Sequence, residues 1–319
     1  MSSKYELCVC IPTFNRSEKV YELVQNILKC TNEKLTVAVL DNASTDDTIT
    51  KLKLINDVRL NIYSNPSNQG SLYNFLHVLD KASDARFALF CLDKDKINAN
   101  HLDAFITELE TSDFGAGYVN HEVGGQIPPT SGPWIEFSAG YESIRRIAYL
   151  GRHPSGYFFN VGMLSNIHHI EKYSDKNLVG LFPFEFILAD ILVHSKGGIY
   201  QDALIYTETL AEARTTKSFT IDGNSSSAYF HPKSRSKQFA NFSIHALKLQ
   251  LSRRNKMLLL VNNFKNGMLS STLGYRAIMQ NEDICIHHHM NTRSVSFIES
   301  IYNGFLFSLL YLLVVIRGK

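Results

Sequence analysis

Short apolar runs alternate with helical patterns over the first hundred residues of the chain. Residues 7–11, 35–40, 58–63 and 87–92 are apolar runs of strand length, and a segment with helical signals follows each of the first three. Strands that alternate with helices of this length indicate right-handed crossovers and a parallel sheet covered on both faces. The pattern therefore predicts an α/β fold.

Polar residues follow each predicted strand. They are residues 12–16 after the first run, Asp41 after the second, the turn 64–70 after the third, and Asp93 with Asp95 after the fourth. Because the carboxyl ends of parallel strands meet at one edge of a sheet, we expect these residues to lie close together. Two carboxylates one residue apart offer oxygen ligands to a divalent cation beside a phosphate-bearing ligand. An Asp-x-Asp triplet is a weak motif on its own, and a solvated loop is the alternative.

Four short motifs occur in a defined order in this half of the chain. They are Ile11-Pro-Thr-Phe-Asn-Arg16, Leu40-Asp-Asn-Ala-Ser-Thr-Asp-Asp-Thr48, Asn68-x-Gly70 with Asn74, and Leu92-Asp-Lys-Asp95. In this order and at these separations they resemble the nucleotide-binding half of family 2 glycosyltransferases, closely over residues 5–110 and loosely over residues 110–215. The resemblance implies a GT-A fold with a Rossmann-like, mostly parallel sheet and flanking helices. It also implies a nucleotide-diphosphate-sugar donor, a Mg²⁺ or Mn²⁺ cofactor and inversion at the anomeric carbon.

The resemblance implies which residues bind the nucleotide-sugar: Pro12, Thr13, Phe14, Asn15, Arg16, Asp41, Asn68, Gly70, Asn74, Asp93, Lys94, Ser155, Gly156 and Arg214. Asp41 is expected to contact the base or ribose, because a carboxylate accepts two hydrogen bonds; a helix cap is the alternative. Asp93 and Asp95 are expected to hold the metal, which stabilises the diphosphate as the glycosidic bond breaks. Ser155 and Gly156 are expected to pass beneath the donor sugar, where a bare backbone allows close approach.

Inverting transfer requires a base that removes the proton of the acceptor hydroxyl group. In the family this base belongs to a Glu-Asp pair at the start of a helix, whereas here Glu185 is followed by Phe186. We expect Glu185 to be the catalytic base, with Asp190 in reserve. Five residues separate the two acids, about 140° around a helix, so they should not share a face. The alternative for Glu185 is a helix cap or an ion pair with an arginine.

The second half of the chain is less regular. Residues 113–133 are rich in glycine and proline and predict a long loop, and residues 197–198 (Gly-Gly) are expected to end a helix before a strand at 199–206. Trp134 and His153 are candidates for acceptor binding. The alternatives are a core aromatic residue and a capped loop histidine, respectively.

The charge of the chain is distributed unevenly. Residues 231–319 hold 12 Lys or Arg and 3 Asp or Glu, against 20 and 27 in residues 1–230, although the net charge is only +2. The terminal apolar segment, residues 297–316, has an uncharged stretch of 13 residues at 304–316. That stretch is too short for a bilayer core of about 30 Å, so an interfacial helix beside a basic patch is expected, and nucleic acid is not an expected partner. A dimer contact and a tail packed on the catalytic domain are the alternatives.

We therefore predict three parts: residues 1–110, the nucleotide-sugar-binding half of a GT-A domain; residues 111–224, its acceptor-binding half; and residues 225–319, a basic helical region with a membrane-associating last helix. The predicted function is transfer of one sugar to a lipid-linked oligosaccharide in bacterial surface polysaccharide synthesis, of the O-antigen or capsule type. One alternative is a catalytically silent nucleotide-sugar-binding or scaffold protein. The other is a sugar nucleotidylyltransferase, whose glycine-rich first loop residues 12–16 do not match.

The predicted location is the cytoplasm, at the inner face of the membrane. The first strand begins almost at residue 1 and leaves no room for a signal peptide. Three of the five cysteines, Cys8, Cys10 and Cys91, lie in predicted buried strands, as expected of reduced thiols. A homo-oligomer is compatible with all of these features.

Overall fold

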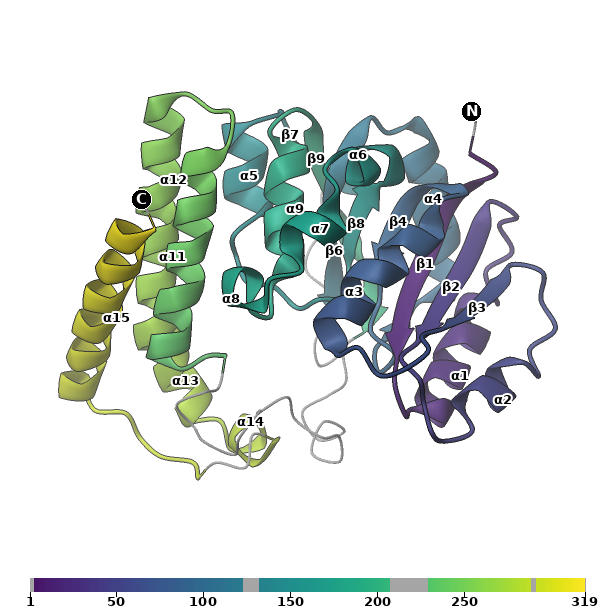
Figure 1. The fold of residues 1–319 in the computed structure, drawn as a ribbon, viewed down its shortest axis with the longest axis horizontal. Helices are drawn as coiled ribbons and strands as arrows, with labels where there is room; N and C mark the ends of the chain where they lie inside the picture. Colours follow the sequence, from purple (N-terminus) through teal and green to yellow (C-terminus); the bar gives the residue numbers. More distant parts are fainter. Residues whose placement is uncertain (1–2, 123–131, 207–228, 288–290, 319) are drawn as a thin grey trace. The chain divides into compact units, whose positions relative to one another are not determined.

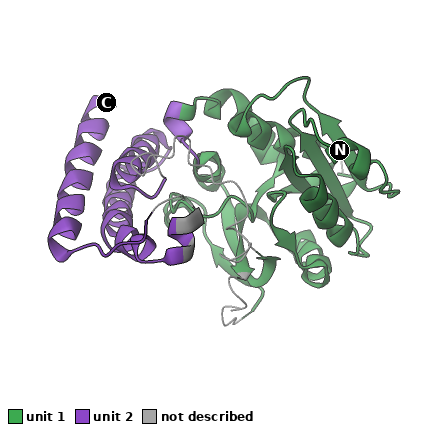
Figure 2. Ribbon diagram, turned by 90° about the horizontal axis from the view of Figure 1, so that it is seen from below, with its two compact units in different colours: residues 1–176, 182–207 green, residues 177–181, 208–319 purple. Residues whose placement is uncertain are grey.

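The computed structural model describes residues 3–122, 132–206, 229–287 and 291–318 (Figure 1). It forms two compact units, coloured separately in Figure 2. The first unit contains residues 1–176 and 182–207, and the second contains residues 177–181 and 208–319. Both predicted halves of the GT-A domain therefore lie in the first unit.

One nine-stranded mixed sheet organises the first unit. Its strands are β1 (Tyr5–Thr13), β2 (Leu35–Asp41), β3 (Leu60–Ser64), β4 (Ala85–Phe90), β5 (Lys96–Ile97), β6 (Phe114–Glu122), β7 (Trp134–Phe137), β8 (Tyr157–Asn160) and β9 (Lys196–Tyr206). They run in the order β3-β2-β1-β4-β8-β6-β9-β5, with β7 paired to β9. The four predicted strands are β1 to β4, and they pair in parallel as expected. Strand β8 pairs antiparallel with both β4 and β6.

Helices cover both faces of this sheet. They are α1 (Ser17–Ile27), α2 (Thr48–Leu52), α3 (Ser71–Leu79), α4 (Ala99–Thr111), α5 (Tyr141–Ile147), α6 (Val161–Asn166), α7 (His169–Tyr173) and α9 (Pro183–Leu192), with a short helix α8 (Lys176–Val179) where the units meet in sequence. Alternate residues of a strand point to opposite faces. The β1 residues Leu7, Val9 and Ile11 pack in one core with α1 and α4. On the other face, the Phe90 ring of β4 meets rings from α3 and α9.

Two of the expectations for the second half were wrong, and the reason is the same for both. The first part of the predicted loop is strand β6, which contains Gly115 and Gly117. A Cβ atom at Gly117 would lie 2.0 Å from the carbonyl oxygen of Gly198, so these glycines permit close strand packing instead of turns. Likewise, Gly197 and Gly198 lie inside strand β9 and do not end helix α9. Residues 123–131 of the predicted loop lie outside the described residues.

The second unit is helical. Its helices are α11 (Pro232–Lys248), α12 (Arg253–Leu269), the π-helical turn η3 (Ser270–Gly274), α13 (Tyr275–Met279), α14 (Glu282–His287) and α15 (Phe297–Arg317), and α11, α12 and α15 lie side by side in Figure 1. Gly267 of α12 allows the Phe307 ring to approach, because a Cβ atom there would lie 2.4 Å from that ring. The hydroxyl groups of Ser243 and Tyr311 are 2.6 Å apart in the interior of this helical group. These contacts fix one face of α15.

The opposite face of α15 is apolar and exposed. Its exposed residues are Phe297, Ile298, Ile301, Tyr302, Phe305, Leu309, Leu312, Leu313 and Ile316. The helix has 21 residues and, by length and composition alone, could cross a membrane; only 28% of its most apolar stretch is buried. The expectation that the segment is too short to span was therefore wrong, because the helix continues back through Glu299, whose charge pairs with Arg293.

Candidate functional site

The ends of β1, β2 and β4 meet at one edge of the sheet, as the sequence predicts. Thr13 at the end of β1 is in register with Asp41 at the end of β2. The Thr13 hydroxyl group donates to Asp93 Oδ2 over 2.9 Å, and Arg16 donates to Asp93 Oδ1 over 2.9 Å. Both oxygens of Asp93 are therefore held by the first loop. Burial raises the pKa of Asp93 above its ordinary value, although the Arg16 charge opposes this shift.

Asp95 has a different environment from Asp93. Its Oδ2 atom lies 2.6 Å from His153 Nε2 and accepts a hydrogen bond from the Ser155 hydroxyl group. Its Oδ1 atom is buried and has no hydrogen-bond partner among the residues that the structure describes. Burial raises the pKa of Asp95, but His153 and Ser155 lower it by more, and the net shift is below the ordinary value. Asp95 is thus a buried carboxylate with one oxygen available to a ligand.

These residues fit a divalent cation only if the ligand contributes to the coordination. A buried carboxylate oxygen without a partner is a suitable ligand for Mg²⁺ or Mn²⁺, and Mg²⁺ is usually held by one or two carboxylates together with substrate phosphates. Within the described ranges, no group of three or more His, Cys, Asp or Glu side chains is placed to hold a metal alone. The expected metal ligands, Asp93 and Asp95, therefore differ: Asp95 has a free oxygen, whereas Asp93 is bound by Thr13 and Arg16.

Asp41 organises the turn after β2. Its carboxylate accepts hydrogen bonds from the backbone N–H of Ser44, over 3.0 Å, and from the Ser44 hydroxyl group. The same hydroxyl oxygen accepts from the N–H of Asn15, over 2.8 Å, and so connects this turn to the first loop. The helix-cap alternative for Asp41 does not hold, because the residue at the N-cap of α2 is Asp47.

An amide network holds the loop before α3. The Asn42 amide donates to Asn68 Oδ1 over 2.9 Å, and the Asn65 amide donates to both Asn42 and Asn74. Gly70 adopts a φ of +83°, which favours glycine. Asn68, Gly70 and Asn74, which were expected at the donor, are thus bound to protein groups at its edge. Asn42 and Asn65 were not predicted, and the only signal for them was the density of asparagine in the two turns.

Ser155 and Gly156 lie directly beside Asp95. The Gly156 N–H donates to the Phe90 carbonyl over 2.9 Å, and its φ is +96°. A Cβ atom on Gly156 would lie 2.8 Å from His121 Nε2. His121 itself lies 2.9 Å from the Ser155 carbonyl oxygen, and burial lowers its pKa to about 4. Sequence reasoning missed His121 because the glycines of β6 hid the strand that carries it.

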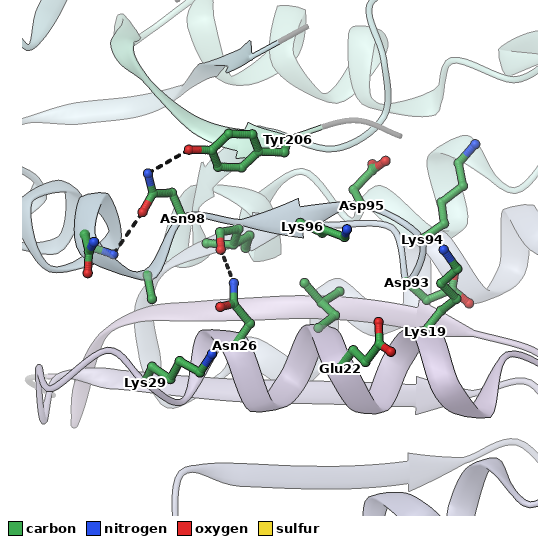
Figure 3. A pocket seen from close by; sticks show the side chains of 14 residues that line it. Lys19, Glu22, Asn26, Lys29, Asp93, Lys94, Asp95, Lys96, Asn98 and Tyr206 are labelled. Atoms are coloured by element: carbon green, nitrogen blue, oxygen red, sulfur yellow. Dashed lines mark hydrogen bonds between the residues drawn. The ribbon is translucent and has the colours of Figure 1, made fainter. Parts of the chain in front are cut away.

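A groove of about 610 Å³ runs from the two aspartates between α1 and β5 (Figure 3). Lys94 lines one end of it together with Asp93 and Asp95, and at the other end the Asn98 amide donates to the Tyr206 hydroxyl group over 2.9 Å. Charged, amide and hydroxyl groups of this kind suit a ligand that carries phosphate and hydroxyl groups.

The two candidates for the base are both enclosed. Glu185 is 0% exposed, and Asp190 is bound by Lys172 and by the Tyr173 hydroxyl group. A base must come within hydrogen-bond reach of the proton that it removes. The assignment to Glu185 or Asp190 stays a prediction, and the burial of these carboxylates argues against it. The helix-cap alternative for Glu185 is also absent, because its carboxylate accepts hydrogen bonds from Leu150, Arg152 and Tyr157 instead.

The remaining predicted site residues differ in their placement. The Trp134 ring contacts Phe105, Phe114, Phe158 and Tyr200, so the structure favours the core-aromatic alternative over stacking on an acceptor. Pro12 is buried at the end of β1, and Phe14 is exposed in the first loop. Arg214 lies outside the described residues.

Residues 8–163, just under half of the chain, match the family model described as Glycosyl transferase family 2. The structure is similar to that of S. aureus TarS residues 1–349 in complex with UDP-GlcNAc, with a TM-score of 0.63, 16% identity and coverage of 98% of this chain and 91% of that chain. No curated protein matches this chain.

A second similar structure is the mannosyltransferase PcManGT from Pyrobaculum calidifontis in complex with GDP-Man and Mn²⁺. Its TM-score is 0.51 at 12% identity, with coverage of 97% of this chain and 88% of that chain. At these identities the likenesses show the fold alone. The chain has a GT-A-like fold, a mixed sheet with flanking helices, and this confirms the predicted fold class.

Proposed function

We propose that this protein is an inverting glycosyltransferase that moves a sugar from a nucleotide-diphosphate donor to an acceptor hydroxyl group. The observation that carries the proposal is the different state of its two aspartates. Asp93 is held by the first loop, while Asp95 keeps a buried oxygen without a described partner. The family match of residues 8–163 and the GT-A-like fold support the same function.

In this proposal Asp95 holds Mg²⁺ or Mn²⁺ through its free oxygen, with the donor diphosphate completing the coordination. The cation supplies Lewis-acid stabilisation to the departing diphosphate. The first loop and the Asp41 turn support the nucleotide, and Ser155 with Gly156 form the floor beside Asp95. The donor nucleotides in the two similar structures, UDP-GlcNAc and GDP-Man, make UDP- and GDP-sugars the first donors to test.

A donor screen tests this function. The purified full chain is incubated with single UDP- and GDP-sugars and Mn²⁺, and release of free nucleotide is measured. We expect at least one donor to be hydrolysed slowly, since water competes with an acceptor in its absence, and we expect EDTA to stop the release. Cation-dependent nucleotide binding without release from any donor would instead favour a silent nucleotide-sugar-binding protein.

The acceptor in this proposal is a lipid-linked saccharide of bacterial surface polysaccharide synthesis, reached at the inner face of the cytoplasmic membrane. The exposed apolar face of α15 supports membrane contact, because monomeric soluble proteins rarely expose large contiguous apolar patches. Exposed basic residues on the same unit, among them Arg253, Arg254, Lys265 and Arg317, complement anionic lipid. An occupant with both apolar and anionic character fits this surface.

Two glutamates on the apolar face of α15 should weaken binding to vesicles. We expect Ile301→Glu with Phe305→Glu to lower partition into phosphatidylglycerol-containing liposomes by about tenfold or more, because each substitution places a charge where acyl chains would lie. Flotation measures the bound fraction. Leu54→Glu with Val58→Glu is the matched control, since these apolar residues are equally exposed in the first unit. Equal flotation of both double variants would refute the assignment. Resistance of the wild type to alkaline extraction would favour a membrane span over an interfacial helix.

A further inference from the structure

Residues 150–155 lie between two buried carboxylates. At one end, Glu185 accepts hydrogen bonds from the backbone N–H groups of Leu150, over 3.2 Å, and Arg152, over 3.0 Å. At the other end, the side chains of His153 and Ser155 hold Asp95 Oδ2. One short segment thus connects the carboxylate of α9 to the carboxylate that keeps a free oxygen.

The conformation of this segment needs support from outside. Tyr149 has a φ of +62°, which is uncommon for a residue with a side chain, and Gly151 and Gly156 have φ values of +64° and +96°. Backbone in such regions persists only where the surroundings fix it. Two backbone N–H groups of the segment end on Glu185, and at the far end Gly156 donates to the Phe90 carbonyl. The segment is therefore fixed at both ends.

Glu185 is itself fixed. In addition to the two backbone groups, its Oε1 atom accepts a hydrogen bond from the Tyr157 hydroxyl group over 2.8 Å. The carboxylate has three donors and no exposed surface. Such a group is well placed to orient backbone and poorly placed to meet an acceptor hydroxyl group.

We propose that Glu185 is a positioning residue for the cation site and not the catalytic base. It holds residues 150–152 so that His153 and Ser155 occupy both hydrogen-bonding directions at Asp95 Oδ2, which leaves Oδ1 for the cation. This inference rests on the proposed function. Its consequence is that loss of the Glu185 carboxylate acts on binding of the cation and diphosphate together, before any proton is removed from the acceptor.

The experiment compares nucleotide binding with and without Mn²⁺ in the full chain. Calorimetry gives the dissociation constants for UDP, or for GDP if UDP does not bind, in wild type, Glu185→Gln, Tyr157→Phe and the control Asp190→Asn. We expect Glu185→Gln to weaken Mn²⁺-dependent binding about tenfold and Tyr157→Phe to weaken it a few-fold. Binding without Mn²⁺ should stay unchanged, and Asp190→Asn should match the wild type.

The possible outcomes separate the two roles of Glu185. If Glu185→Gln binds Mn²⁺ and nucleotide as tightly as the wild type, and releases nucleotide from the donor normally but transfers no sugar, Glu185 is the base and the inference is wrong. If Glu185→Gln does not fold, Tyr157→Phe decides, because it keeps the carboxylate: unchanged Mn²⁺-dependent binding in that variant refutes the positioning role. If the wild type binds neither UDP nor GDP, the proposed function fails and the inference fails with it.

Discussion

Replacing Asp95 with asparagine is expected to lower cation-dependent nucleotide release from the donor by about 10²–10³-fold. Asparagine can still accept hydrogen bonds from His153 and Ser155 through its single oxygen, so the local structure should persist. Its NH₂ group would then occupy the place of Oδ1, the buried oxygen that has no described partner. A donor group there repels a cation. The measurement is nucleotide release over a range of Mn²⁺ concentrations, with thermal unfolding as the check on folding.

Asp113→Asn is the matched control for this substitution. Asp113 is an exposed carboxylate of the same unit that pairs with Lys196 over 2.8 Å, and exposed pairs of this kind contribute little to stability. We expect its activity and its dependence on Mn²⁺ to equal those of the wild type. Undiminished, Mn²⁺-dependent release by the Asp95 variant would place the cation elsewhere in the molecule.

The first half of the fold and the position of the site were predictable because strand order and chemistry coincide there. Each of the first four strands ends in a polar segment, and parallel pairing brings the ends of β1, β2 and β4 to one edge. Thr13 and Asp93 therefore meet although 80 residues separate them. The periodicity of the apolar residues was enough to infer this arrangement.

The second half was harder to predict because glycine has two opposite meanings. In a sequence it indicates a turn, whereas at Gly117 and Gly198 it allows two neighbouring strands to approach within van der Waals distance. Reading these glycines as turns concealed β6 and, with it, His121. A third missed feature, the hydrogen bonds of Glu185 to residues 150–152, depends on tertiary packing of α9 that no local pattern reveals.

These observations change how the departure from the family's Glu-Asp pair is understood. At the sequence level, Phe186 is a missing acid in an otherwise familiar motif. In the structure, Phe186 is 0% exposed and its ring meets the rings of Tyr149 and Tyr173. The position therefore belongs to the core of this fold, and its neighbour Glu185 is bound to backbone. Restoring the family residue should not restore a base.

Phe186→Asp is accordingly expected to destabilise the first unit strongly. The substitution removes a buried aromatic ring and places a carboxylate among apolar rings, where an uncompensated buried charge costs on the order of 3–5 kcal/mol. Chemical denaturation, followed by a probe specific to the first unit, measures the free energy of unfolding. We expect soluble yield to fall as well, with no gain in nucleotide release per folded molecule.

Phe186→Leu separates the effect of the charge from the effect of lost packing. Leucine keeps the site apolar and should cost about 1.5 kcal/mol or less if the neighbouring rings repack. A large difference between the two variants would mean that position 186 excludes charge, as its enclosure by Tyr149 and Tyr173 implies. A stable Phe186→Asp variant with faster sugar transfer would instead show that the site can accept the family's acid. Because Glu185 is already saturated with donors, such a gain would have to come from the new carboxylate alone.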